Sequence, residues 1–372
     1  MSPERAPVLH PTGNPEDDGA PAQHPARYRT TVSVVVCCYT ERRWADLLNA
    51  IGSLGRQTIA PDTVILVVDH NAMLLARLRS AFPRLTVVAN RHRRGLTGAR
   101  NTGVEESCGE VVAFLDDDAT AEPDWLERLV AEYADGDVIA VGGHIEPNWV
   151  RGRPVWFPAE FDWVVGCSYR GQPAGRAVVR NVIGANMSFR RAVVVNSGGF
   201  GEQLGRVGTR PTGCEETELC IRAAELTGGQ VIHQPQARVL HRVPPERCTF
   251  AYFRARCYAE GLSKATVMQL TGSGPALRTE RSYVLRVLPA GVLRAVRDAA
   301  APGPARTIGR AGAIAFGLLS TAWGYLVGSY GQRGRASGCS SGLRLPGWPG
   351  PARLAGPQRS AQPPDEPLHR TV

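Results

Sequence analysis

Glu110-Val-Val-Ala-Phe-Leu-Asp-Asp-Asp-Ala119 is the stretch of this sequence that decides the fold. A short run that is apolar on both faces is typical of a buried strand in a parallel, helix-covered sheet, and ligands bind beyond the carboxyl ends of such strands. Three carboxylates packed at a strand end repel one another, and their oxygens suit Mg²⁺ or Mn²⁺ carrying phosphate. We therefore expect a metal and diphosphate site here. The alternative is a solvated turn before the helix that Glu122-Pro-Asp124 opens.

Around this stretch, residues 31–145 alternate between strand-like and helical runs. Strands are expected at 32–38, 64–68, 85–89, 111–115 and 138–142. Helices are expected between them at 41–54, 72–82, 97–107 and 125–133. Such alternation with short connections indicates right-handed βαβ units and a parallel sheet. We predict an α/β fold with a nucleotide-binding half at 31–146.

The chain from 147 to 272 is less regular, and we predict that it forms the acceptor half of the same domain, 31–272. Its first part, 148–179, is rich in Trp, Phe, Gly and Pro. Strands are expected at 182–189, 230–232 and 238–243, and helices at 215–226 and 249–270.

The two ends of the chain differ in composition from this domain. Residues 1–30 and 333–372 are rich in Pro, Gly and charge, and we expect disordered tails. The segment 273–332 is predicted to form apolar helices. Within it, 311–332 has no charged residue and is long enough to span a bilayer, whereas 283–296 resembles an interfacial helix. We predict membrane association, with a soluble helical hairpin as the alternative.

Composition restricts the partners and the compartment. The net charge of +9 is spread along the chain without a nucleic-acid module signature, so we expect anionic ligands or an anionic membrane surface and no nucleic acid. The nine cysteines are odd in number and scattered, which predicts neither a disulfide framework nor a zinc site. We expect the cytoplasm, at the inner face of the cell membrane.

Two further motifs are candidates for donor binding. Asp69 ends the second expected strand and, in a parallel sheet, shares an edge with the Asp triplet, where it can accept hydrogen bonds from a base or ribose. The run from Asn90 to Gly103 is a basic, Gly-punctuated loop at a helix start, which can supply N–H groups and the Arg100 guanidinium to a diphosphate. Its alternative is a solvated basic loop.

Acidic residues also gather at the expected helix that starts at Glu215, where the dipole stabilises negative charge. A carboxylate held ionised there can take the proton from an attacking hydroxyl, although ordinary helix-start charge is the alternative. His241 ends an apolar strand and can reach the same cleft as a metal or phosphate ligand, whereas a lone His is more often structural.

Six motifs in this order resemble the family-two inverting glycosyltransferases of GT-A fold. They are Val34-Val-Val-Cys-Cys-Tyr39-Thr-Glu41, Val67-Val-Asp69, Gly95-Leu-Thr-Gly-Ala-Arg100-Asn-Thr-Gly103, Phe114-Leu-Asp116-Asp-Asp118-Ala119, Gly184-Ala-Asn186-Met-Ser-Phe-Arg190 and Glu215-Glu216-Thr-Glu218-Leu219. The resemblance covers 31–270 and implies a Rossmann-like, mostly parallel sheet with helices on both faces, followed here by the helical C-terminal segment.

The resemblance, with the candidates above, assigns roles to individual residues. It implies Glu216 as the catalytic base. It implies a Mn²⁺ or Mg²⁺ ion held by Asp118 and Asp116, and the position of His241 at its strand end makes it the third candidate ligand. The remaining roles are donor contacts from Tyr39, Glu41, Asp69, Arg100, Asp116 and Asp117, and acceptor contacts from Asn186, Glu215 and Glu218. The chain departs from the family in Asp69-His-Asn71, where Asp-Asp-Gly-Ser is frequent, and in Glu at the base position, where Asp is usual.

Within the family, runs at 163–171, 180–188 and 258–264 resemble a subgroup that includes glucosyl-dolichyl-phosphate glucuronosyltransferases. This implies inverting, metal-dependent transfer from a nucleotide sugar, such as UDP-glucuronate or UDP-glucose, to a hydroxyl of a polyprenyl-phosphate-linked sugar or another glycoconjugate. Alternatives are transfer to a small secondary metabolite, synthesis of nucleotide sugars, and a non-catalytic membrane or nucleic-acid-associated binding protein.

Overall fold

A computed structural model describes residues 29–206, 212–272, 278–300 and 308–336 of the 372-residue chain. The chain divides into two compact units, 1–329 and 330–372, and the account below concerns the first. The predicted tails, 1–30 and 333–372, lie almost wholly outside the described residues. The predicted boundary at 273 coincides with no division between these units and stays a prediction.

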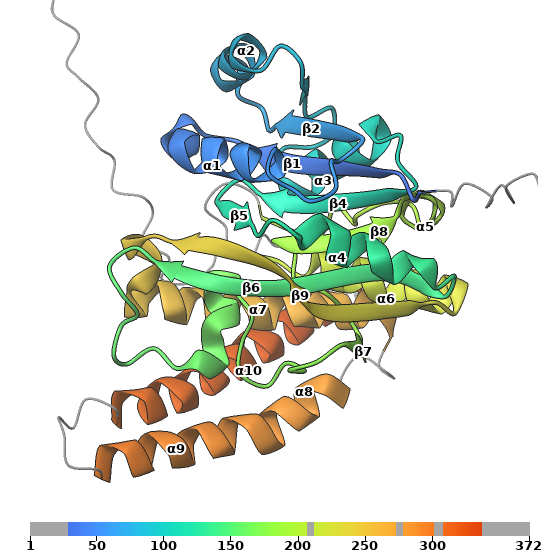
Figure 1. Ribbon diagram of the computed structural model, residues 1–372. Coiled ribbons are helices and arrows are strands. Elements are labelled where there is room, and N and C mark those ends of the chain that lie inside the picture. Colours follow the sequence, from blue (N-terminus) through green and yellow to red (C-terminus); the bar gives the residue numbers. More distant parts are fainter. Residues whose placement is uncertain (1–28, 207–211, 273–277, 301–307, 337–372) are drawn as a thin grey trace, which may run out of the picture. The chain divides into compact units, whose positions relative to one another are not determined.

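In the described residues the strands form one nine-stranded sheet, in the order β3-β2-β1-β4-β8-β6-β9-β5, with β7 paired to β9 (Figure 1). The strands are β1 (Val32–Cys38), β2 (Thr63–Val68), β3 (Thr86–Ala89), β4 (Val111–Asp116), β5 (Ala119–Ala121), β6 (Val138–Trp149), β7 (Ala177–Val179), β8 (Asn186–Arg190) and β9 (Gln230–Val243).

Strands β3, β2, β1 and β4 are parallel, which confirms the predicted βαβ half. Strand β8 runs antiparallel to β4 and β6, and β5 and β7 run antiparallel to β9. The sheet as a whole is therefore mixed, because its second half is built without a helical crossover between β6 and β8. The two short strands expected at 230–232 and 238–243 are parts of one long strand, β9, whose pairing with β6 changes register between them.

The helices lie close to the predicted positions, except α5, which was not predicted. They are α1 (Trp44–Leu54), α2 (Ala72–Ala81), α3 (Leu96–Glu106), α4 (Trp125–Ala131), α5 (Arg191–Asn196), α6 (Glu215–Thr227), α7 (Phe250–Thr271), α8 (Arg278–Ser282), α9 (Leu288–Ala300) and α10 (Ile308–Ala336). Two short helical segments, η1 (Glu41–Arg43) and η3 (Ala159–Val165), complete the parts that matter below.

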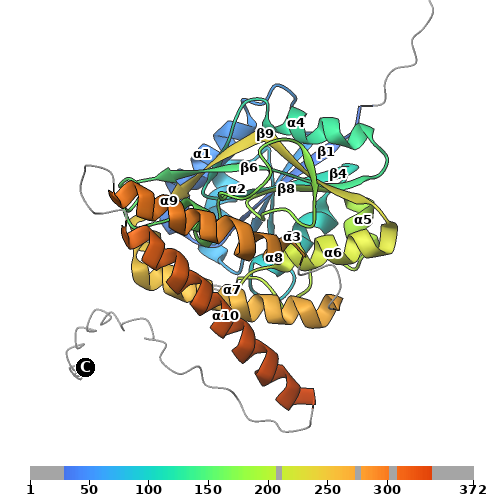
Figure 2. The same ribbon diagram turned by 90° about the horizontal axis from the view of Figure 1, so that it is seen from below.

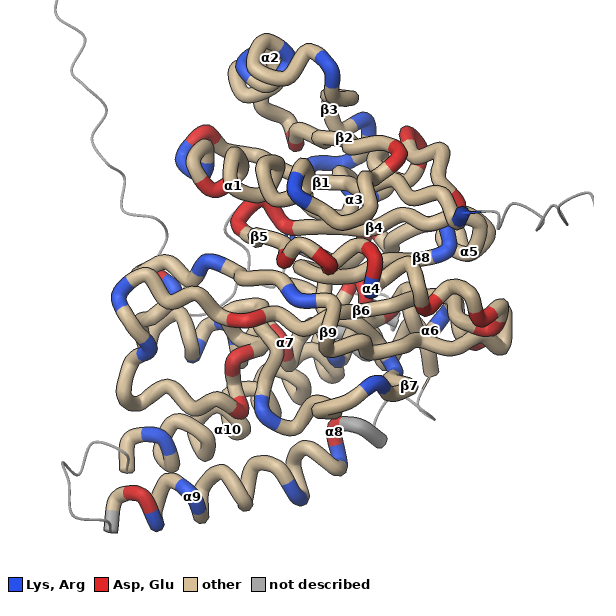
Figure 3. The backbone as a smooth tube through the Cα atoms, in the orientation of Figure 1, with Lys and Arg blue, Asp and Glu red and all other residues tan. Residues whose placement is uncertain are grey.

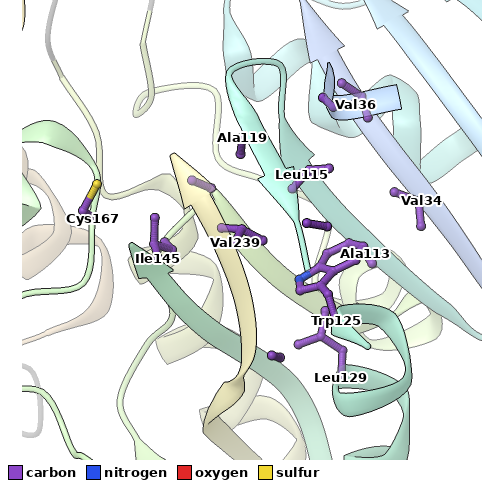
Figure 4. Packing of buried hydrophobic residues seen from close by; sticks show 14 of the residues in the cluster. Val34, Val36, Ala113, Leu115, Ala119, Trp125, Leu129, Ile145, Cys167 and Val239 are labelled. Atoms are coloured by element: carbon purple, nitrogen blue, oxygen red, sulfur yellow. The ribbon is translucent and has the colours of Figure 1, made fainter. Parts of the chain in front are cut away.

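Both faces of the sheet are buried, because alternate residues of β1 enter two different hydrophobic clusters. Val34 and Val36 pack with Trp125 of α4, as Figure 4 shows, whereas Val35 packs on the opposite face with residues of α3, α5 and α6. Helix α3 approaches β1 very closely at Gly103, where a Cβ atom would lie 2.4 Å from Val35 Cγ1. This contact requires glycine and fixes the helix that carries Arg100.

The C-terminal helices of the first unit pack on the acceptor half. Arg294 of α9 pairs with Glu160 of η3 over 2.6 Å, and a Cβ on Gly317 of α10 would meet the ring of Phe161 at 2.5 Å. One helix of the described chain, Ile308–Gly331, is long and apolar enough to cross a membrane, and 22% of its most apolar window is buried. By length and composition alone this is weak support for a membrane span.

Candidate active site

The site lies at the carboxyl edge of the parallel strands. Cys38 at the end of β1 is paired with Val68, which precedes Asp69, and Cys37 is paired with Asp116. The structure therefore confirms that Asp69 and the Asp triplet share one edge of the sheet. Figure 3 shows the triplet as a red stretch of the tube between β4 and β5.

The triplet is less exposed than a carboxylate run at a strand end suggests. Only the Asp116 side chain is substantially exposed, at 30%, whereas those of Asp117 and Asp118 are 4% and 5% exposed. Asp117 and Asp118 are covered because β5 starts directly after Asp118 and pairs with β9, with Ala119 opposite His241.

Asp118 sits among cationic and imidazole groups. His241 Nε2 lies 3.1 Å from Asp118 Oδ1, and Arg43 and Arg247 lie 3.2 and 3.4 Å from Asp118 Oδ2. Burial alone would raise the pKa of Asp118, but the contact with His241 and the two guanidinium groups hold that pKa below its ordinary value. Asp118 is therefore held ionised.

Asp116, Asp118 and His241 can hold a metal ion together. One ligand atom from each residue lies within 4.8 Å of the others. Two carboxylates and one imidazole form a donor set that suits Mn²⁺. Mg²⁺ prefers oxygen ligands, which the two carboxylates supply. The residues present fit a divalent cation, and Arg43 and Arg247 partly balance the carboxylate charge without it.

Asp117 contacts protein rather than open space. Arg43 Nη1 donates to Asp117 Oδ1 over 2.6 Å, and Asp117 Oδ2 is buried without a partner among the described residues. Burial raises the pKa of Asp117 to about 7, although Arg43 opposes the shift. The predicted donor contact of Asp117 is not visible in these interactions and stays a prediction.

Arg43 and Arg247 were missed by sequence reasoning. Arg43 ends η1, whose first residue Glu41 follows the Thr40 cap, and Arg247 lies just past β9. Their positions in the sequence could have pointed to them, because each follows a strand that ends near the triplet. Arg residues are frequent in this chain, so position alone did not separate these two from the rest.

Arg100 joins the triplet to the start of α6. Its Nη1 donates to Glu215 Oε1 over 2.7 Å, its Nη2 donates to Gly184 O over 3.0 Å, and Nη2 lies 3.6 Å from Asp116. Arg100 is 2% exposed, so these contacts form in a site from which water is largely excluded. The structure thus brings together Asp116, Arg100 and Glu215, three predicted site residues that are far apart in the sequence.

Glu216 lies at the same helix start. Its side chain is half-buried and receives a hydrogen bond from its own backbone amide, whereas no ion pair with another residue is present in the described part of the chain. Burial and then the neighbouring Glu215 carboxylate raise the pKa of Glu216 to about 8. Near neutral pH it can therefore both accept and release a proton, which suits a general base.

The remaining predicted donor residues line the same edge. Asp69 accepts hydrogen bonds from Asn90 Nδ2 at 2.7 Å and from the Gly95 amide at 3.1 Å, so it organises the basic loop before α3. Tyr39 is 47% exposed directly after β1, and Glu41 is half-buried in η1. An exposed ring beside this edge can stack on a base.

Two of the predicted acceptor residues have structural roles. Asn186 is completely buried, accepts from Trp125 Nε1 at 2.7 Å, and donates to the backbone of Ala237 and His144. Glu218 is buried and makes a bidentate pair with Arg222. Both side chains are engaged by partners within the protein, and their predicted acceptor contacts stay predictions. Glu215 is likewise engaged, by Arg100.

Comparison with known proteins agrees with this geometry. Residues 33–197 match the family Glycosyl transferase family 2. The chain is 40% identical over 237 residues to the glucosyl-dolichyl phosphate glucuronosyltransferase of Haloferax volcanii, covering 63% of this chain and 76% of the relative. It belongs to glycosyl transferase family 2. The chain is accordingly a glycosyltransferase, as its motifs predicted.

A further relative and a solved structure are also similar to this chain. Succinoglycan biosynthesis protein ExoM of Rhizobium meliloti is 27% identical over 248 residues, which cover 62% of this chain and 72% of that protein. Among solved structures, the mannosyltransferase PcManGT from Pyrobaculum calidifontis in complex with GDP-Man and Mn²⁺ matches 82% of this chain and 87% of that one, with a TM-score of 0.53 and 22% identity. This likeness confirms the predicted GT-A fold of the family-two enzyme.

Proposed function

We propose that this enzyme transfers a sugar, with inversion, from a nucleotide-sugar donor to a hydroxyl of a polyprenyl-phosphate-linked sugar, in a reaction that depends on a divalent metal ion. A UDP-sugar, UDP-glucuronate or UDP-glucose, is the proposed donor. The name of the Haloferax volcanii relative supports both the lipid-linked acceptor and the glucuronate donor.

One observation carries the proposal. Asp116, Asp118 and His241 could hold a metal ion together, and Arg100 links Asp116 to the start of α6. There Glu216 has a raised pKa and no ion pair among the described residues. A diphosphate site and a base belong on opposite sides of the reacting carbon in a single displacement. Arg100 fixes the two groups relative to each other.

The proposed roles of the residues follow from their contacts. Asp116, Asp118 and His241 would hold Mn²⁺ or Mg²⁺, which supplies positive charge to the diphosphate when bound. Tyr39 and Asp69 would contact the nucleoside. Glu41, two residues after Tyr39, would also contact the nucleotide-sugar donor. Arg100 and Arg247 add fixed positive charge around the place where negative charge develops on the leaving group.

Glu216 would take the proton of the acceptor hydroxyl. As its oxygen forms a bond to the anomeric carbon, the bond from that carbon to the donor phosphate oxygen breaks, and the nucleoside diphosphate leaves with the electron pair. Because attack and departure are on opposite faces, the configuration inverts. A carboxylate with a raised pKa is a stronger base than an ordinary glutamate.

The acceptor and the place of action belong to the same proposal. The apolar C-terminal helices fit a lipid-linked acceptor, so we place the enzyme in the cytoplasm at the inner face of the cell membrane. A small soluble acceptor would leave these helices unexplained.

The deciding experiment is a nucleotide-release screen of the full chain against UDP-, GDP- and TDP-sugars, with and without Mn²⁺, and with a short polyprenyl-phosphate-linked glucose as acceptor. We expect acceptor-dependent UDP release that EDTA stops and Mn²⁺ or Mg²⁺ restores. Equal release with and without metal would remove the metal from the proposal, and release from GDP-sugars alone would remove the UDP donor. The Asp116→Asn variant serves as the inactive control.

A further inference from the structure

Helix α10 has an inverted distribution of side chains. Its inward face is rich in small residues, with Ala313, Gly317, Gly324 and Gly328 buried beside Ile314, whereas its outward face carries large apolar side chains. These outward side chains are Ile308, Phe316, Leu319, Trp323 and Leu326. Leu319 and Trp323 are 68% and 62% exposed. A helix on a water-exposed surface normally shows the opposite pattern, so this face requires an apolar partner.

The inward face of α10 is locked against α7. A Cβ on Gly324 would lie 2.1 Å from Tyr258 O, and a Cβ on Gly261 would lie 2.1 Å from Thr321 O. One turn further along, Gly328 faces Ala265 in the same way, at 2.8 Å. The two helices therefore touch backbone to backbone where α10 crosses α7 (Figure 2).

The neighbouring part of α7 carries charge at the level of this contact. Glu260 pairs with Arg256 over 3.3 Å and lies 3.6 Å from Lys264 Nζ, and these residues flank Gly261. If α10 crossed the hydrocarbon core while packed in this way, the charged stretch of α7 would enter it too. Charged side chains at the bilayer centre are disfavoured, so the observed packing favours a helix that lies in the plane of the membrane over one that spans it.

Helix α9 extends the apolar surface and adds charge. It packs beside α10, where a Cβ on Gly291 would lie 3.0 Å from Ile314 Cδ1. Leu293 is 70% exposed, and Arg297 on the same helix is exposed without an ion-pair partner among the described residues. Figure 3 shows both basic and acidic positions on α9, where Arg294 is paired with Glu160 and Asp298 follows Arg297. Arg286, in the segment before α9, is equally exposed and unpaired within the described chain.

We propose that α9 and α10 form an in-plane docking surface for an anionic lipid bilayer, an inference that rests on the proposed membrane association and specifies its geometry. Exposed apolar side chains enter the interface, and the unpaired Arg residues contact anionic headgroups. The enzyme then lies on one leaflet with its catalytic edge in water, and α10 does not cross.

The test compares vesicle binding of the full chain with that of a Leu319→Glu/Trp323→Glu variant, using vesicles of phosphatidylcholine with and without phosphatidylglycerol. We expect the wild type to bind the anionic vesicles more tightly and the variant to bind them at least about tenfold more weakly, because two large apolar side chains no longer enter the interface. Met73→Glu is the matched control, since Met73 is an exposed apolar residue on α2. Leu293→Glu provides an independent variant on α9.

Further measurements separate the rival arrangements. Alkaline carbonate should release the bound wild-type protein from the vesicles. The fluorescence of Trp323, identified by comparison with the Trp323→Phe variant, should be quenched by lipids brominated near the headgroup and not by lipids brominated deep in the acyl chain. Retention after carbonate, or deep quenching, would overturn the in-plane geometry. Unchanged vesicle binding by both Glu variants would show that this surface does not bind lipid. If the wild type is a dimer and Leu319→Glu makes it a monomer, the surface is an interface between two copies of the chain. Nucleotide release with a soluble acceptor is independent of these results, so failure of the proposed reaction would be seen separately.

Discussion

Arg100 Nη1 donates to Glu215 Oε1 over 2.7 Å, and the two side chains are only 2% and 4% exposed. The same guanidinium lies 3.6 Å from Asp116 and donates to Gly184 O. A Cβ on Gly184 would lie 2.6 Å from Arg100 Nη2, so the glycine leaves room for this contact. A single buried cation therefore sets the distance between the end of β4 and the start of α6.

We predict that Arg100→Met destabilises the fold by about 3–5 kcal/mol, because the substitution leaves the Glu215 carboxylate buried without its partner. Urea unfolding measures the change. The double variant Arg100→Met/Glu215→Gln should recover part of the loss, since it removes the uncompensated charge as well. Equal stability of Arg100→Met and wild type would show that the pair is not the link between the two elements.

We expect substitutions of the two candidate metal ligands in the triplet, Asp116 and Asp118, to differ in their effect on stability. Asp116→Asn should abolish metal-dependent transfer with little change in thermal unfolding, because Asp116 is partly exposed. Asp118→Asn should lose both activity and stability, since it removes the carboxylate that faces Arg43, His241 and Arg247. Nucleotide release with Mn²⁺ and a thermal unfolding curve test the pair together. Full activity in either variant would contradict the metal assignment.

The parallel half of the sheet and the edge that carries Asp69 and Asp116 could be predicted because both depend on local patterns. Apolar runs and amphipathic helices repeat along the chain at short range, and parallel strands place their carboxyl ends together. The motif order then indicated the family. These features require no knowledge of which distant segments meet.

The parts that could not be predicted depend on long-range pairing. Asp118 is covered only because β5 pairs with residues around His241, more than a hundred positions later. Asn186 and Glu218 belong to family motifs, but the structure uses them to hold Trp125 and Arg222. Sequence position alone cannot tell a buried polar side chain with partners from one that faces a substrate.

The contact between α7 and α10 gives a prediction with a matched pair of glycines. Gly261→Ala should destabilise the protein by about 1–3 kcal/mol, because the added methyl would meet the backbone of Thr321. Gly312→Ala, on α10, should instead stabilise it by about 0.5–1 kcal/mol, since a Cβ there meets nothing within 4 Å. Thermal unfolding of both variants is the measurement. The same sign for both would show that the helices do not touch at Gly261.

The raised pKa of Glu216 also predicts how stability depends on pH. In the folded protein this carboxyl holds its proton to about pH 8, whereas in the unfolded chain it releases it near 4.5. The folded state therefore binds more protons in this window, and the contribution of Glu216 to stability falls as pH rises from about 4.5 to about 8. Glu216→Gln should flatten this part of a stability–pH curve. An unchanged slope would contradict the raised pKa.

The last prediction concerns catalysis by the same residue. Glu216→Gln keeps the size of the side chain but cannot take a proton, so turnover should fall by about 10²–10⁴-fold while donor binding changes little. In the wild type, turnover should rise with pH toward about 8 as Glu216 loses its proton, and the variant should lack this rise. Glu218→Gln is the control, because Glu218 is paired with Arg222 and should affect turnover only through stability. If Glu216→Gln keeps near-normal turnover at saturating donor and acceptor while Glu215→Gln does not, the base is Glu215, and its contact with Arg100 would have to open during the reaction.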